Sequence, residues 1–176
     1  PRQSLSLADA VDDLRERLRE AVRIRLIAEV PLGAFLSGGV DSGTVVALMA
    51  GLLDQPVKTC SIGFDKPEFD ESAPAQAVAD RYVTDHHLEI VRSHDFELAR
   101  RVARIYDEPF ADSSAMPTYQ VCGLARKHVT VALSGDGGDE AFGGYRRYKL
   151  HLMEERLRSM LPLPLRQAVF APLGDI

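Results

Sequence analysis

Two glycine-rich segments carry hydroxyl and carboxylate side chains, a combination that suits the binding of a phosphorylated ligand. The first reads Ser-Gly-Gly-Val-Asp-Ser over residues 37–42 and lies between an apolar run, 31–36, and a helical segment, 42–53. Glycines permit a tight turn that brings backbone N–H groups close to an anion, and a helix start adds N–H groups that lack intrahelical partners. We therefore predict a pyrophosphate-binding loop at residues 37–42.

The spacing in this loop differs from that of the better-known phosphate loops. A Walker loop needs Lys-Ser or Lys-Thr after its last glycine, and a dinucleotide fingerprint needs Gly-x-Gly-x-x-Gly; neither occurs here. The Ser-Gly-Gly-x-Asp-Ser pattern resembles instead the pyrophosphate loop of ATP pyrophosphatases, which split ATP between its α and β phosphates. The alternative interpretation is an ordinary strand-to-helix turn capped by Asp41 or Ser42.

The second segment, residues 134–145, contains five glycines and three carboxylates in twelve residues. Carboxylates beside a triphosphate are repelled unless a hard cation lies between them, and Mg²⁺ prefers oxygen ligands. We therefore predict that Asp41 and Asp139 bind Mg²⁺. A flexible surface turn is the alternative for this segment.

Apolar periodicity predicts the elements that position these segments. Short strands are expected at 31–36, 57–64, 86–91 and 129–133, and helices at 7–27, 42–53, 72–82, 95–106 and 114–127. The alternation predicts an α/β fold with a parallel sheet covered by helices on both faces. Because ligands of such sheets bind beyond the carboxyl ends of the strands, residues 37–42, 63–70 and 134–145 should share one edge.

The composition and net charge limit the classes of molecule that this chain is expected to bind. The chain of 176 residues is 45% hydrophobic, which suits a single domain, and its 21 basic and 26 acidic residues give a formal charge of -5, which argues against non-specific binding to nucleic acid. With no long apolar run and no secretory signal, we predict no membrane association and a cytoplasmic location. Cys60 and Cys122 are expected to be buried free thiols, and the adjacent His86 and His87 should point to opposite faces of a strand, as structural side chains rather than metal ligands.

Five motifs together resemble one family. They are Pro-Leu-Gly-Ala-Phe-Leu-Ser-Gly-Gly-Val-Asp-Ser (31–42), Ser-Ile-Gly-Phe (61–64), Thr-Asp-His-His (84–87), Tyr-Asp-Glu-Pro-Phe-Ala-Asp-Ser-Ser (106–114) and Ala-Leu-Ser-Gly-Asp-Gly-Gly-Asp-Glu-Ala-Phe-Gly-Gly-Tyr (132–145). In this order they resemble the synthetase domain of glutamine-hydrolysing asparagine synthetase, over about residues 5–150. This resemblance implies the PP-loop ATP-pyrophosphatase superfamily and its adenine-nucleotide α-hydrolase-like fold.

The resemblance also implies a reaction and its substrates. The side-chain carboxylate of aspartate attacks the α phosphorus of ATP, pyrophosphate leaves, and ammonia derived from glutamine displaces AMP from the β-aspartyl-adenylate to give asparagine. ATP and Mg²⁺ are the implied cofactors, and aspartate and ammonia are the implied partners. Catalysis of this kind rests on positioning and electrostatic stabilisation.

The family's functional residues map onto matching positions of this sequence. The resemblance implies nucleotide contacts at Leu36, Ser37, Gly38, Gly39, Asp41, Ser42, Ile62, Ser134 and Gly135. It implies that Asp136 acts in forming or using the adenylate, that Asp139 shares Mg²⁺ with Asp41, and that Glu140 orients neighbouring groups. It also suggests an amino-acid pocket near Asp107, Glu108, Ser113 and Ser114, for which a plain helix cap at Ser113 is the alternative.

Two departures from the family pattern shape the expected domain organisation. The chain begins with Pro1 rather than with the nucleophilic cysteine of the glutaminase half, and the family's synthetase domain continues beyond the equivalent of Ile176. We therefore expect residues 1–176 to be an ATP-pyrophosphatase domain fragment without the glutaminase domain and the C-terminal helical part, where a catalytic lysine of the family lies. Residues 151–176 should form a helix, a turn and the start of a helical extension.

Other enzyme classes could use the same phosphate-binding loop. A β-lactam-forming synthetase, or an amidotransferase acting on a sugar or peptide carboxylate, would use the same ATP site with another acceptor. A non-catalytic nucleotide-binding module is a further alternative, whereas the acidic charge and residues 134–145 count against a tRNA-modifying pyrophosphatase. The sequence leaves a monomer and a homodimer both open.

Overall fold

Four parallel strands form the sheet around which the chain folds. The computed structural model describes residues 6–92 and 96–160. Its strands are β1 (Leu32–Phe35), β2 (Lys58–Phe64), β3 (Asp85–Val91) and β4 (Val131–Leu133). Its helices are α1 (Leu7–Arg25), α2 (Val40–Ala50), α3 (Ser72–Tyr82), α4 (Phe96–Ile105), α5 (Ala115–Ala125), α6 (Gly138–Phe142) and α7 (Arg146–Met160).

These elements belong to two compact units, Pro1–Asp136 and Gly137–Ile176, and each is described by itself. The first contains the whole sheet and helices α1 to α5, and the second contains α6 and α7. The segments 37–42 and 134–136 therefore lie in the first unit, whereas Asp139 and Glu140 lie in the second.

The strand order of the sheet is β3-β2-β1-β4, and all pairings are parallel. Chain progression runs from β1 outward to β2 and β3, and β4 then joins β1 on its other side, where Gly33 pairs with Ala132. The direction of strand addition thus reverses between β1 and β4. In open α/β sheets, ligands bind at the carboxyl ends of the two strands that flank such a reversal.

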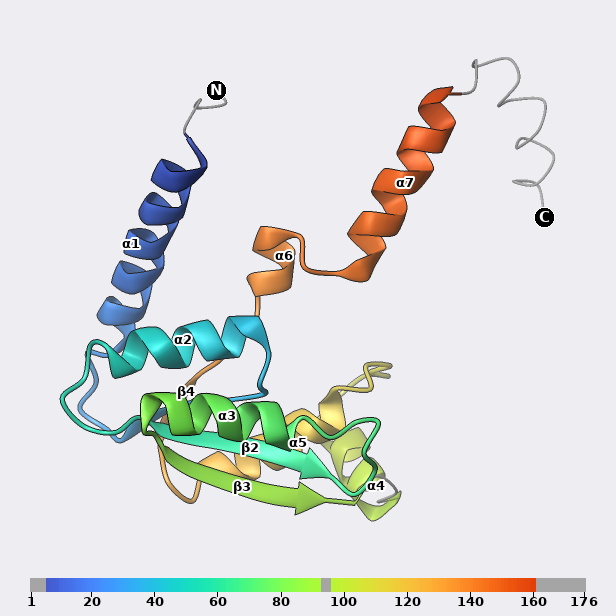
Figure 1. The fold of residues 1–176 in the computed structure, drawn as a ribbon. Helices are drawn as coiled ribbons and strands as arrows, with labels where there is room; N and C mark the ends of the chain where they lie inside the picture. Colours follow the sequence, from blue (N-terminus) through green and yellow to red (C-terminus); the bar gives the residue numbers. More distant parts are fainter. Residues whose placement is uncertain (1–5, 93–95, 161–176) are drawn as a thin grey trace. The chain divides into compact units, whose positions relative to one another are not determined.

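Helices cover both faces of this sheet, as predicted. On one face, α1, α2 and α3 bury a cluster that includes Val22, Val46, Met49 and Ala79 against Ala34 and Leu36. On the other face, α5 packs against β1, β2 and β4 through a second cluster composed of Cys60, Leu124, Ala125 and Val129 with Phe35, Val121 and Ala132 around them. Figure 1 shows α2 and α3 side by side over the sheet, and α4 packs on α5 through Leu98, Val102 and Ala115.

Several local expectations are confirmed. Helix α1 begins at Leu7, as predicted, because the Ser6 side chain accepts a hydrogen bond from Asp9 N and donates one of 2.7 Å to Asp9 Oδ2. His86 is a hydrogen-bonded structural side chain, since its Nδ1 lies 2.9 Å from the Thr59 hydroxyl. His87 stacks on the ring of His128, with 3.5 Å between centroids.

Other expectations need correction. Residues 134–145 are not a continuous turn, because Gly138–Phe142 form α6 and Gly137 precedes it in a left-handed conformation. Helix α7 begins at Arg146 rather than at residue 151, and the turn and extension expected beyond it lie outside the described residues. Cys60 is buried but Cys122 is exposed, because it lies on the outer side of α5. None of the helices among the described residues is long and apolar enough to cross a membrane.

Candidate functional site

Residues 37–42 form a turn that is held together by two serine side chains. The hydroxyl groups of Ser37 and Ser42 lie 2.9 Å apart, and Ser42 Oγ accepts a hydrogen bond of 3.2 Å from Ser37 N. Ser42 is buried, and its hydroxyl also lies 3.3 Å from the carbonyl oxygen of Gly39. These contacts fix both ends of the turn, so its shape is set before any ligand binds.

The glycines of the turn place the start of α2 at its mouth. Gly38 has φ = 75°, in the left-handed region that glycine adopts without strain. Gly39 is the N-cap of α2 and provides no side-chain hydrogen bond, and the first intrahelical bond runs from Gly43 N to Gly39 O at 3.0 Å. Capping by Asp41 or Ser42 is therefore not observed, because the helix begins before them. The N–H groups of its first turn lack intrahelical acceptors and suit an anion.

The segment after β4 lies directly against this turn. A Cβ atom added at Gly135 would lie 2.5 Å from Ser42 N and 2.8 Å from the carbonyl carbon of Asp41. Such distances are below any real carbon contact, so only glycine permits this approach. The structure thus brings two segments more than ninety positions apart in the sequence into contact at the strand-order reversal, as the shared-edge argument predicted.

Leu36 and Ile62 flank the turn from the two neighbouring strands. The Leu36 side chain is buried in the core, its N–H donates to Cys60 O at 3.0 Å, and its carbonyl accepts a short hydrogen bond from the Ser61 hydroxyl. A nucleotide contact at Leu36 would therefore use the second lone pair of that carbonyl. Ile62 is partly exposed near the end of β2, so its predicted contact stays a prediction.

Asp41 lies in the first turn of α2 and is partly exposed. Its carboxylate makes no hydrogen bond or ion pair within residues 6–92 and 96–160, so its oxygens are available to a hard cation such as Mg²⁺. Within those same ranges, no three His, Cys, Asp or Glu side chains lie close enough together to hold a metal ion. The donor chemistry of Asp41 fits Mg²⁺ that is also bound by phosphate oxygens.

The second unit holds Asp139 and Glu140 in the first turn of α6. The Tyr145 hydroxyl donates a short hydrogen bond to Glu140, which lowers the pKa of this carboxyl group and raises the pKa of Tyr145 to about 12. A Cβ atom added at Gly144 would overlap Asp139 Oδ1, so a side chain there would require this carboxylate to rotate away. Glu140 is thus ionised and oriented by its own unit.

The remaining predicted residues differ in their surroundings. Asp136 is exposed, and its N–H lies 3.4 Å from the Ser134 hydroxyl. Asp107, Glu108, Ser113 and Ser114 are all exposed ahead of α5. The N-cap of α5 is Ser114 rather than Ser113; its side chain makes no capping hydrogen bond, and its N–H donates to Asp112 Oδ1 at 2.8 Å.

Sequence reasoning missed Asp70, which follows β2 and is partly buried. Its carboxylate accepts three hydrogen bonds, from Phe64 N, Ser72 N and the Ser72 hydroxyl. The available signal was the Asp-x-Ser spacing at residues 70–72, which favours a local side-chain turn.

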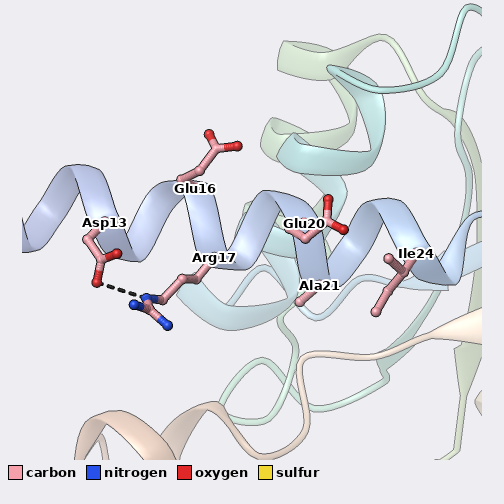
Figure 2. A pocket seen from close by; sticks show the side chains of 6 residues that line it. All are labelled: Asp13, Glu16, Arg17, Glu20, Ala21 and Ile24. Carbon is pink, nitrogen blue, oxygen red and sulfur yellow. Dashed lines mark hydrogen bonds and ion pairs between the residues drawn. The ribbon is translucent and has the colours of Figure 1, made fainter.

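An open depression lies elsewhere, along one side of α1. Figure 2 shows the six residues that line it, all from α1: Asp13, Glu16, Arg17, Glu20, Ala21 and Ile24. Asp13 and Arg17 form an exposed ion pair there, with 2.8 Å between Oδ2 and Nε. None of the predicted site residues belongs to this depression, and exposed ion pairs along one helix face are ordinary surface features.

Comparisons with known proteins bear on the fold and the family. The family model described as asparagine synthase matches residues 13–173. A putative glutamine-hydrolysing asparagine synthetase 2 from Methanocaldococcus jannaschii is 46% identical over 156 residues, which cover 88% of this chain and 30% of that protein. Glutamine-hydrolysing asparagine synthetase 1 from Bacillus subtilis is 38% identical over 141 residues, 79% of this chain and 22% of that protein.

These shares mean that the chain spans about a quarter of the length of the relatives it matches. Among solved structures, an NH3-dependent NAD synthetase from Campylobacter jejuni superposes with a TM-score of 0.50 at 12% identity, covering 76% of this chain and 60% of that one. At this identity the likeness concerns the fold alone. It confirms the predicted parallel sheet of the adenine-nucleotide α-hydrolase-like class.

Proposed function

The chain belongs to the asparagine synthase family, and from that premise we propose that the protein containing it is an ATP-dependent ligase that converts aspartate to asparagine. The nitrogen would come from glutamine, as ammonia released by another part of the protein. In this proposal, residues 1–176 supply the ATP-binding part of the synthetase site. The predicted cytoplasmic location and the open choice between monomer and homodimer stay predictions.

The turn at residues 37–42 would bind the two phosphates that leave as pyrophosphate. Its shape is fixed in advance by the Ser37 and Ser42 hydroxyls, and the N–H groups in the first turn of α2 would donate to the bound anion. A helix N-terminus carries a partial positive charge, so it stabilises the negative charge that develops on pyrophosphate as the bond to the α phosphorus breaks. Asp41 would bind Mg²⁺, which neutralises phosphate charge when bound, and the second ligand expected at Asp139 stays a prediction because that residue lies in the other unit.

The segment after β4 would bind the part of ATP that remains as AMP. Gly135 lies against the N-terminal turn of α2, so a nucleotide bound at Ser134 and Gly135 would present its α phosphate beside residues 37–42. Leu36 and Ile62 would contact the adenosine, and the exposed Asp136 would act in forming or using the adenylate. Glu140, which Tyr145 keeps ionised, would orient neighbouring groups.

The proposed chemistry balances in two steps. A carboxylate oxygen of aspartate attacks the α phosphorus, and pyrophosphate leaves with the electron pair of the broken bond. Ammonia then attacks the β carbonyl carbon, AMP leaves, and the nitrogen loses a proton to give the amide. Neither step needs a covalent bond to the protein, so the residues act by positioning and by charge stabilisation.

The observation that carries this proposal is the contact between Gly135 and the first turn of α2. It supports a single nucleotide site built from residues 37–42 and 134–136, which belong to the same unit. The test is pyrophosphate release from ATP by the full-length protein, with and without L-aspartate, for the wild type, Asp41→Ala and Asp54→Ala. Asp54 is an exposed control in the segment after α2.

We expect aspartate-dependent release by the wild type and by Asp54→Ala, and a loss of about a hundredfold or more for Asp41→Ala, because a carboxylate that binds the metal at a transferring phosphate contributes several kcal/mol. Equal rates for the two variants would remove Asp41 from the site. Release that depends on another carboxylate but not on aspartate would identify a different acceptor.

A further inference from the structure

Asp70 connects the end of β2 to the start of α3. Its Oδ1 accepts hydrogen bonds from Phe64 N at 3.3 Å and from Ser72 N at 3.1 Å, and its Oδ2 accepts one of 2.8 Å from the Ser72 hydroxyl. These bonds, those of Ser72 first, lower the pKa of the Asp70 carboxyl group, so it is ionised near neutral pH. A single side chain thus joins two elements that border the candidate site.

On its β2 side, the Asp70 carboxylate packs tightly against Gly63. Gly63 is buried, and a Cβ atom added there would lie 2.8 Å from Asp70 Oδ1 and 2.6 Å from Ile90 Cδ1. The absence of a side chain at Gly63 therefore allows the Asp70 carboxylate to reach Phe64 N. Ile62, the predicted adenosine contact, immediately precedes this glycine.

On its α3 side, the connection made by Asp70 reaches the turn at residues 37–42. A Cβ atom added at Gly38 would lie 2.7 Å from Ala75 N and 2.8 Å from Pro74 Cβ, both in the first turn of α3. The left-handed turn at Gly38 is thus formed against the same helical turn whose N-terminal end Asp70 holds. A shift of that helical turn toward Gly38 would displace the glycine, because backbone atoms of Pro74 and Ala75 already fill the space beside it.

We propose that Asp70 is a positioning residue for ATP binding: by fixing the first turn of α3 to the end of β2, it sets the conformation of residues 37–42 and the position of Ile62. It acts through Ser72, Gly38 and Gly63 and contacts no reacting group. This inference rests on the proposed function only in so far as the ligand is ATP.

The test compares Asp70→Asn with Asp112→Asn in the full-length protein. Asp112 is a matched control because its carboxylate also accepts a hydrogen bond from the N–H two positions later, at the start of α5. Both variants keep side-chain size and lose the charge. Two measurements are made: amide hydrogen exchange of residues 36–43 without ligand, and the KM values for ATP and L-aspartate.

We expect Asp70→Asn to raise the KM for ATP about tenfold, since hydrogen bonds to a charged acceptor are about twice as strong as neutral ones. The KM for L-aspartate should stay within twofold, and residues 36–43 should exchange faster. Asp112→Asn should leave the KM for ATP and the exchange of residues 36–43 unchanged. Ser72→Ala, which removes only the hydroxyl donor, should shift them in the same direction by a smaller factor, and it serves as the variant if Asp70→Asn does not fold.

Equal exchange of residues 36–43 in Asp70→Asn and Asp112→Asn would overturn the inference, and so would equal KM values for ATP. The two proposals fail in different ways. A wild-type protein that does not use ATP overturns the proposed function. The exchange measurement still decides whether Asp70 holds the loop, because it needs no ligand.

Discussion

Replacement of Gly135 by alanine tests the contact on which the candidate site depends. The added Cβ atom would lie 2.5 Å from Ser42 N, 2.8 Å from the carbonyl carbon of Asp41 and 3.0 Å from Asp41 Cβ. Ordinary carbon contacts begin near 3.5 Å, so the segment after β4 must move by about 1 Å. The neighbouring atoms are mostly backbone atoms of the first turn of α2 and have no alternative rotamer.

The size of the effect follows from this overlap. Forcing one extra carbon into a packed site costs about 1–3 kcal/mol, so the melting temperature should fall by several degrees. ATP affinity should fall at least tenfold, or about 1.4 kcal/mol, because the displaced segment and the N-terminal turn of α2 no longer face one nucleotide together. Calorimetric titration with ATP and Mg²⁺, combined with thermal unfolding, measures both quantities.

Gly123→Ala is the matched control. Gly123 lies within α5, and a Cβ atom added there meets no atom within 4 Å. Alanine should stabilise the helix by up to about 1 kcal/mol and leave ATP affinity unchanged. The reasoning is refuted if Gly135→Ala binds ATP within twofold of the wild type. A stability loss without an affinity loss would show that the contact is structural and that the nucleotide binds elsewhere.

Two further predictions follow from the described contacts. Ser42→Ala removes the hydroxyl that bonds to Ser37, so we expect unfolding free energy to fall by about 1–2 kcal/mol and ATP affinity to fall with it, as measured by denaturant unfolding and titration. The second prediction concerns His86, whose pKa is lowered below its ordinary 6.5 mainly by burial and then by the charge of His87. Below about pH 6.5 the unfolded chain therefore binds a proton at this residue that the folded chain does not bind. The free energy of unfolding should fall as the pH drops below that value. His86→Gln should reduce this acid sensitivity, with a slope that stays below the one-proton limit of about 1.4 kcal/mol per pH unit because the ring is only partly buried; an unchanged slope would contradict the assignment.

The sequence predicted the fold class because apolar periodicity reports burial directly. The four strands and five of the helices lie within a few residues of their predicted bounds. Helix α2 begins at Val40 rather than at residue 42, because its N-cap is Gly39, which has no side-chain signal, while Asp41 and Ser42 imitate a cap. Helix α6 has five residues, too few for a periodic pattern among glycines.

The sequence predicted the segments that make up the candidate site but not the contacts between them. The residue types at 37–42 and 134–136 indicate phosphate chemistry, and parallel-sheet geometry places both at one edge. The contact of Gly135 with α2 depends on the pairing of β4 beside β1, which no local pattern specifies. The Asp-x-Ser spacing signals a local turn at Asp70, but its link to residues 37–42 becomes visible only when Gly38 is seen to pack beside the start of α3.

The most direct test of the account follows an oxygen atom of aspartate. The full-length protein is incubated with ATP, an ammonia source and L-aspartate labelled with ¹⁸O in its side-chain carboxylate, and AMP and pyrophosphate are analysed by mass spectrometry. Attack at the α phosphorus predicts one ¹⁸O atom in AMP and none in pyrophosphate, because the bridging oxygen leaves with AMP. Formation of ADP with labelled phosphate, or of AMP without label, would contradict the account.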